Sequence, residues 1–293
     1  MTRRIKKKPE EELDALVDSV LDPRTPPIAN VKPGETLEVE TWSALARVIN
    51  PTTGPLYIEG AEPGDTLVVD IINIELPSQG IVGIIPGFGA LEGWLNLMEP
   101  KRKICKIENN TITYVRDDGR KLELKADPLI GTIGVAPEVE AISSLTPGRH
   151  GGNMDCPDIR PGNKLLLPVT RPGALFKLGD VHAIQGDGEV CGVAAEVDAM
   201  VTLKVSLRKG WTINWPRIEA PDEIMTVGSA RPLEDAARYA YREMVEWMVA
   251  DYGWDRDDAY MFLSLAGKAR IAQIVDPLYT VVAKLSKVHL RMS

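Results

Sequence analysis

The chain has 293 residues, and its 34 Lys and Arg residues are outnumbered by 42 Asp and Glu residues, giving a formal net charge of −8 at pH 7. Phosphate binding requires a basic surface, so this balance argues against nucleic acid as a partner. No apolar run approaches the roughly 18 residues of a membrane-spanning helix, and no apolar segment follows the basic N-terminus as in a secretory signal. With three cysteines and no CxxC pair, the composition predicts a cytoplasmic protein without a disulfide framework.

The N-terminal segment divides into a basic tail and an amphipathic stretch. The tail, RRIKKK at residues 3–8, is expected to be solvated and disordered. PEEELDALVDSVL at 9–21 predicts a short helix, because Pro9 suits a first turn and the apolar residues recur on one face. We therefore expect residues 1–27 to form a tail with a short helix, and residues 28–293 to form the main domain.

Residues 28–215 are rich in Gly, Pro and β-branched residues, and turn signals separate short alternating runs. This composition predicts a β-rich region with a barrel or sandwich-like core. One phrase recurs: VKPGETLEVET at 31–41 is echoed by AEPGDTLVVDI at 61–71 and more loosely by RPGNKLLLPV at 160–169. In each copy a Pro-Gly turn is expected to lead into a strand.

Helical patterns return in residues 216–293, so the predicted fold class is mainly β with α elements (α+β). A helix is expected over 233–252, where apolar residues recur on one face and Gly253 follows. Asp255 is expected to cap a second helix that ends at Gly267. The runs ARIAQIV and TVVAKL, on either side of Asp276-Pro277, predict two closing strands.

A first polar cluster lies in HGGNMD at residues 150–155. Its adjacent glycines remove side chains where the backbone must pass close to another group, so His150, Asn153 and Asp155 could converge on one point. The alternative is an ordinary hydrogen-bonded turn, which Asn and Asp favour by themselves.

A second cluster, GDVHAIQGDGE at residues 179–189, favours a metal site. On an extended strand Asp180 and His182 project from the same face, and Asp187 and Glu189 follow in a turn. The flanking runs are apolar, and buried carboxylates need partners such as a metal ion. A mixed set of His and carboxylate ligands suits Zn²⁺, our first choice, with Ca²⁺ or Mn²⁺ as alternatives.

The two clusters together resemble the acetamidase/formamidase family. HGGNMD followed by GALFKLGDVHAIQGDGEVCG is similar to that family, and PPIANVKPGETLEVET, IPGFGAL, LIGTIGVAP and LSLAGKARIAQIVDP follow its order. The resemblance implies hydrolysis of a small carboxamide, such as formamide or acetamide, to a carboxylic acid and ammonia. It also implies a largely β fold and a homo-oligomer, a dimer or higher. Members often carry a histidine before the PP turn, and this chain has none there.

The requirements of amide hydrolysis suggest a role for each of these side chains. A metal ion would activate water and polarise the carbonyl. Glu189 is the expected general base and acid, Asp187 a further ligand or orienting partner, and Asn153 a donor to the amide oxygen. The expected metal ligands are His150, Asp155, Asp180 and His182.

Two alternatives remain at this point. A thiol, Cys156 or Cys191, could be the nucleophile with a neighbouring carboxylate as base, although a free Cys in a strand is more often a buried apolar residue. The same clusters could also form a non-catalytic metal site in a β-rich structural or ligand-binding protein. Ammonia release from simple amides distinguishes an amidase from the non-catalytic protein.

Overall fold

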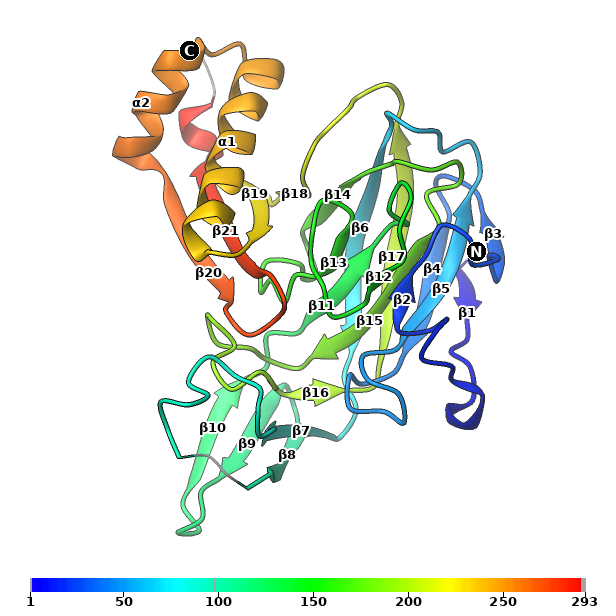
Figure 1. Ribbon diagram of the computed structural model, residues 1–293, viewed down its shortest axis with the longest axis vertical. Helices are drawn as coiled ribbons and strands as arrows, with labels where there is room; N and C mark the ends of the chain where they lie inside the picture. Colours follow the sequence, from blue (N-terminus) through cyan, green and yellow to red (C-terminus); the bar gives the residue numbers. More distant parts are fainter. Residues whose placement is uncertain (1, 97–98, 291–293) are drawn as a thin grey trace.

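The computed structural model describes residues 2–96 and 99–290, which form a mostly β structure with two α-helices near the C-terminal end (Figure 1). The first large sheet has nine strands. In spatial order they are β1 (Thr2–Ile5), β4 (Thr36–Thr41), β17 (Ala199–Arg208), β6 (Thr66–Glu75), β14 (Lys164–Pro168), β18 (Arg217–Glu219), β19 (Glu223–Ala230), β21 (Tyr279–Ser286) and β20 (Lys268–Gln273).

The second large sheet has ten strands and carries the central elements of the molecule. Its main path is β10 (Lys121–Lys125), β9 (Thr111–Val115), β8 (Lys101–Glu108), β7 (Gln79–Ile84), β16 (Glu196–Val197), β15 (Phe176–His182), β11 (Leu129–Gly134) and β13 (Gly151–Asn153). Beside this path, β5 (Thr52–Ile58) pairs with β15 and with β3 (Ala29–Val31), and a separate ribbon joins β2 (Val20–Leu21) to β12 (Ile142–Ser143).

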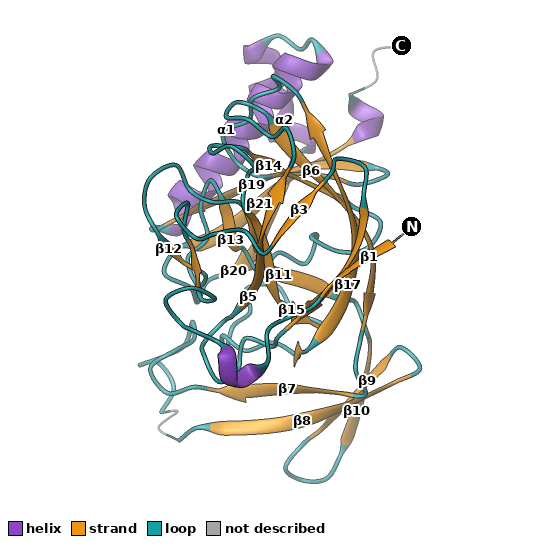
Figure 2. Ribbon diagram, turned by 90° about the vertical axis from the view of Figure 1, so that its right-hand side faces the viewer, coloured by secondary structure: helices purple, strands orange, loops and turns teal. Residues whose placement is uncertain are grey.

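Neither large sheet closes on itself, since each path ends in two edge strands. The sandwich-like alternative therefore describes the core better than a barrel. Side chains from both sheets form one apolar cluster, with Val39 and Val69 from the first sheet and Ile130 and Leu178 from the second. The side view in Figure 2 shows the long strands of the body enclosing this region. The predicted α+β class is confirmed.

The three Pro-Gly phrases lead into strands, as the sequence predicts, and the structure places these strands in the same sheet. They lead into β4, β6 and β14, which lie close together in the nine-stranded sheet. The turn glycines Gly34, Gly64 and Gly162 have φ values of 96°, 92° and 92°, a left-handed conformation that favours glycine. The repeated phrase therefore marks strand entries, not a solenoid repeat.

Both predicted C-terminal helices form: α1 (Leu233–Tyr252) and α2 (Arg256–Ala266). Gly253 ends α1 in a left-handed conformation, and the Asp255 side chain accepts hydrogen bonds from two backbone N–H groups at the start of α2. Helix α1 packs its apolar face on β19 and β21, at the upper left of Figure 1. In the described part of the chain, no helix combines the length and apolarity that a membrane crossing requires.

The N-terminal segment differs from its prediction. The basic tail is ordered, because β1 pairs with β4 and Lys7 forms an ion pair with Asp198 at 2.7 Å. A 3-10 helix, Glu10–Glu12, and turns replace the predicted helix. A tertiary contact accounts for the difference. The buried Lys177 ammonium donates hydrogen bonds to the carbonyls of Val17 and Val20, at 2.7 and 2.8 Å, so these carbonyls accept from a side chain instead of from helical N–H groups.

Strands β7, β8, β9 and β10 form an antiparallel extension, which we call the arm. Each strand pairs with the next, and the arm occupies the lower edge of the molecule in Figures 1 and 2. The arm connects to the body through β16, which pairs with both β7 and β15. One short strand, β16, therefore separates the arm from β15, which carries Asp180 and His182.

The seating of α1 on the sheet is tested by Gly228→Ala. A Cβ atom at this position would collide with the carbonyl oxygen of Ala236 and lie 2.6 Å from the backbone nitrogen of Ala240. Overpacking of this kind typically costs about 1–3 kcal/mol. We expect a loss of that size in the free energy of unfolding measured with urea. Gly186→Ala, whose Cβ would meet no atom within 4 Å, is the control and should change it by less than about 1 kcal/mol; equal losses would contradict the packing argument.

Candidate functional site

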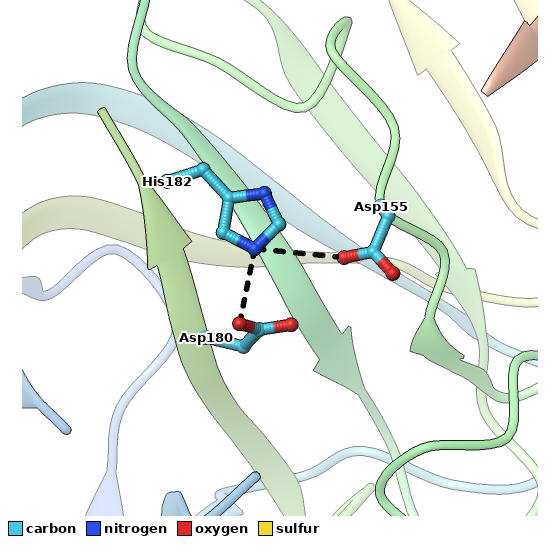
Figure 3. A group of neighbouring side chains, drawn as sticks. All are labelled: Asp155, Asp180 and His182. Carbon is cyan, nitrogen blue, oxygen red and sulfur yellow. Dashed lines mark hydrogen bonds and ion pairs between the residues drawn. The ribbon is translucent and has the colours of Figure 1, made fainter. Parts of the chain in front are cut away.

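Three side chains from the two sequence clusters converge in the interior. Asp180 and His182 lie on β15, and Asp155 follows β13 (Figure 3). The Nε2 atom of His182 is 3.1 Å from Asp180 Oδ1 and 3.9 Å from Asp155 Oδ1. All three residues are buried. The two clusters therefore meet at one point, as the spacing within each of them suggests.

Two further carboxylates approach the same imidazole. Glu196 on β16 is the direct strand partner of His182, and its Oε1 atom lies 3.2 Å from His182 Nε2. Glu189, in the loop between β15 and β16, brings a carboxylate oxygen within 4.8 Å of the ligand atoms of both residues. His182 is thus shared by two groups of possible ligands, one with Asp155 and Asp180 and one with Glu189 and Glu196.

Asn153 links these carboxylates to one from the C-terminal part of the chain. Its Nδ2 group donates hydrogen bonds to Asp155 Oδ2 and Asp276 Oδ2, both at 2.8 Å. Its Oδ1 atom accepts hydrogen bonds from Asn50 and Thr132. Because both N–H groups are engaged with carboxylates, Asn153 positions them and has no free hydrogen for a substrate oxygen in this arrangement.

The backbone of β11 makes room for the cluster at Gly131. Paired residues on either side place Gly131 opposite Asp180, and its carbonyl accepts hydrogen bonds from the N–H groups of Met154 and Asp155. A Cβ atom here would collide with Asp155 Oδ1 and lie 2.6 Å from Asp180 Oδ2. The absence of a side chain at Gly131 therefore lets two carboxylates approach each other.

Three of the clustered residues adopt a backbone conformation that non-glycine residues rarely use. Asp155, Asp180 and Glu189 have φ values of 39°, 53° and 44°. Such conformations cost energy and often occur at functional sites. The surrounding hydrogen bonds hold these residues in place, so their side chains point inward.

Gln185 fixes the orientation of the His182 ring. Its Nε2 group donates to the carbonyls of Asp155 and Ala272, at 2.7 and 3.0 Å. Its Oε1 atom must therefore accept from His182 Nδ1, which is 2.9 Å away. The other ring nitrogen, Nε2, is left facing the carboxylates. Histidines that bind metals commonly show this pattern, with one nitrogen held by a hydrogen bond and the other on the metal.

Burial and mutual repulsion perturb the titration of the cluster. Burial raises the pKa values of Asp155, Glu189, Glu196 and Asp276 well above their ordinary range, and neighbouring carboxylates add to the rise. The pKa of His182 follows from opposing effects: burial would lower it, but the carboxylates of Glu196 and Asp180 raise it well above its usual value. So many buried carboxyl groups require either protons or a bound cation.

Two buried oxygen atoms of the carboxylate cluster, Asp155 Oδ1 and Glu196 Oε2, have no hydrogen-bond partner within the described structure. Leaving a buried carboxylate oxygen without a partner is costly, so such atoms indicate a missing positive partner. One imidazole nitrogen surrounded by carboxylate oxygens is a donor set that suits a divalent cation. The residues present therefore fit a metal ion.

Two of the predicted site residues lie elsewhere. His150 is in none of the groups of possible ligands found among the described residues. Its ring stays within its own turn, where a Cβ atom on Gly152 would lie 3.0 Å from its Nε2, and burial lowers its pKa to about 4. The Asp187 side chain is 59% exposed and pairs with Arg270 at 2.9 Å. Sequence proximity to the cluster did not bring either side chain into it.

The thiols are poorly placed for nucleophilic attack. Burial raises the pKa of Cys156 to about 12, so its thiol stays protonated at neutral pH. Cys191 is half-buried, and its Sγ atom donates to the carbonyl of Val193 at 3.2 Å. Neither thiol is hydrogen-bonded to a side chain of the cluster in the described structure. The geometry therefore favours the carboxylate and histidine groups as the reactive ones.

Sequence reasoning missed four residues that complete the site: Glu196, Asp276, Gln185 and Gly131. Glu196 had a visible signal, because it is a single carboxylate inside the apolar run VAAEV. Gln185 lies within the second cluster, three residues after the histidine that it orients. Asp276 and Gly131 depend on contacts between distant segments, which one sequence does not display.

Known proteins are similar to this chain in sequence and in fold. The profile of the Acetamidase/Formamidase family matches residues 138–286, half of the chain. Acetamidase from Mycolicibacterium smegmatis is 25% identical over 264 residues, covering 64% of this chain and 65% of that protein. The matched part of the chain thus spans less than two thirds of that relative.

Two solved structures match over nearly the full length of both chains. An acetamidase from Yersinia enterocolitica has a TM-score of 0.90 at 38% identity and covers 100% of this chain and 94% of its own. An acetamidase from Bacillus halodurans has a TM-score of 0.88 at 36% identity and covers 98% of each chain. These matches confirm the resemblance seen in the sequence motifs, and the chain belongs to the acetamidase/formamidase family.

Proposed function

We propose that this protein hydrolyses a small carboxamide, of the formamide or acetamide type, to a carboxylic acid and ammonia. Water supplies the oxygen of the new carboxyl group, the C–N bond breaks, and nitrogen leaves as ammonia after gaining a proton. Family membership supports this activity. The observation that carries the proposal is the convergence of Asp155, Asp180, Glu189 and Glu196 on the His182 imidazole in a buried site.

The proposed cofactor is a divalent metal ion, with Zn²⁺ preferred and Ca²⁺ or Mn²⁺ as alternatives because carboxylates dominate the donor set. His182, Asp155 and Asp180 would hold it, with Glu196 as a further ligand through its unpartnered oxygen. When bound, such an ion polarises an amide carbonyl and lowers the pKa of water to about 7.

Glu189 is proposed to move the proton. Burial and the nearby Asp155 raise its pKa, which makes its carboxylate a stronger base than an exposed one. It takes a proton from the attacking water and then donates it to the departing nitrogen. Asn153 and Gln185 act as positioning residues, because their hydrogen bonds fix the carboxylates and the imidazole.

Ammonia release from formamide, acetamide and propionamide tests the activity and its metal dependence together. We expect zinc-loaded protein to release ammonia, and chelator-treated protein that remains folded to release almost none. Full activity without metal would contradict the proposed cofactor. Tight metal binding without hydrolysis of any amide would instead favour the non-catalytic metal-binding protein.

The proton-transfer role predicts different effects for two carboxylates only two residues apart. Glu189→Gln should lower kcat by about 10²–10⁴-fold, because the amide cannot exchange the proton. Asp187→Asn, the same chemical change at an exposed position, should keep kcat within about threefold. Steady-state ammonia release measures both. Equal losses would contradict the assignment of Glu189.

The cradle at Gly131 predicts a loss of metal binding in Gly131→Ala. The added methyl group displaces Asp155 and Asp180, so divalent-ion affinity should fall by at least about 10–100-fold. Isothermal titration with Zn²⁺ measures this, and far-UV circular dichroism verifies the fold. Gly186→Ala is the control and should bind as the unmodified protein does. Unchanged affinity in Gly131→Ala would place the metal elsewhere.

The cytoplasmic location and the homo-oligomeric state expected from the sequence stay predictions. Size-exclusion chromatography with light scattering measures the oligomeric state directly.

A further inference from the structure

An apolar cavity of about 410 Å³ lies between the arm and the loop that joins β15 to β16. Val82, Ile112 and Tyr114 line it from the arm, and Ile184 and Val193 line it from the loop. Val82, Tyr114 and Ile184 are partly buried and pack against the main apolar core, which supports the walls of the cavity. The arm and the loop thus each supply a wall of the cavity.

This cavity shares a wall with the carboxylate cluster. Glu189 and Gln185 both line it, and both adjoin His182 on their other side. Glu189 is the only buried ionisable carboxyl group among its lining residues, since Asp187 is exposed at the rim. A molecule in the cavity therefore has apolar surroundings along its body and the proton-carrying carboxyl group at one end.

We propose that this cavity receives the acyl group of the substrate, and that the preferred substrates are primary carboxamides with an apolar acyl group larger than acetyl, from butyramide to benzamide. The proposal rests on the amide hydrolysis proposed above. The carboxamide end lies toward Glu189, and the hydrocarbon part extends toward Val82 and Tyr114 on the arm.

The size and chemistry of the cavity support a larger acyl group. Cavities that enclose drug-sized ligands begin at about 300 Å³, so this one exceeds what formamide or acetamide fills. A charged acyl group would lose its hydration against walls that offer few polar partners. Each buried methylene contributes about 0.8 kcal/mol, which corresponds to about fourfold in kcat/KM.

Val82 is the residue that tests this assignment best. It lies on β7, away from the carboxylate cluster, and its side chain is one wall of the cavity. Val82→Trp should fill the space needed by a large acyl group and leave room for formamide. Val115 is the matched control: it is exposed at the end of β9, next to Tyr114 but not among the lining residues.

The experiment measures kcat/KM of the zinc-loaded protein for formamide, acetamide, butyramide and benzamide. For the unmodified protein we expect a rise of about fourfold per added methylene from acetamide to butyramide, with benzamide above acetamide. Val82→Trp should lower kcat/KM for butyramide and benzamide by at least about tenfold and change that for formamide by less than about threefold. Val115→Trp should leave the whole series unchanged.

The possible failures are distinguishable. Hydrolysis of formamide and acetamide with kcat/KM that falls steadily as the acyl group grows overturns the cavity assignment and leaves the amidase activity intact. An equal loss for all four amides in Val82→Trp, with the fold preserved, also overturns it. If Val82→Trp does not fold, the series measured on the unmodified protein decides. No ammonia from any amide overturns the proposed function and this inference together.

Discussion

The constraint that dominates the site is the mutual repulsion of the buried carboxyl groups gathered around one imidazole. Asp155, Asp180, Glu189 and Glu196 all lie near His182 in positions with almost no exposure to solvent. Carboxylates packed in this way do not remain together without protons or a cation between them. The missing side chain of Gly131 gives the carboxyl groups of Asp155 and Asp180 room to approach each other. Hydrogen bonds from Asn153 hold Asp155 and Asp276, while Asp155 Oδ1 and Glu196 Oε2 are left without partners in the described structure.

The site brings together residues that lie far apart in the chain. The carboxylates around His182 lie between residues 155 and 196, whereas Asp276 lies in the turn between β20 and β21. Asn153 bridges them by donating to Asp155 and Asp276 at the same distance. The turn between β20 and β21 therefore supplies one of the buried carboxyl groups, and Arg231 holds that turn by donating to the carbonyl of Asp276 at 2.8 Å.

The sequence predicts those features that local spacing determines. Asp180 and His182 follow from the period of a strand, and the α+β class follows from the runs of turn signals and the C-terminal helices. Spacing along the chain does not predict contacts that depend on the register between strands. Glu196 faces His182 because β16 pairs with β15, although fourteen positions separate the two residues along the chain. The ligand role of His150 stays a prediction: its backbone pairs near Gly134 and its ring remains in its own turn, and its buried Nε2 atom has no hydrogen-bond partner among the described residues.

The central claim is that the carboxylate and histidine cluster is a metal-dependent centre for amide hydrolysis. Anomalous diffraction from crystals of zinc-loaded protein, recorded at the zinc absorption edge, tests the location of the ion directly. The account predicts a peak bonded to His182 Nε2 and to oxygen atoms of Asp155 and Asp180. In catalytically active crystals, a zinc peak elsewhere in the protein and none beside these three residues would contradict it.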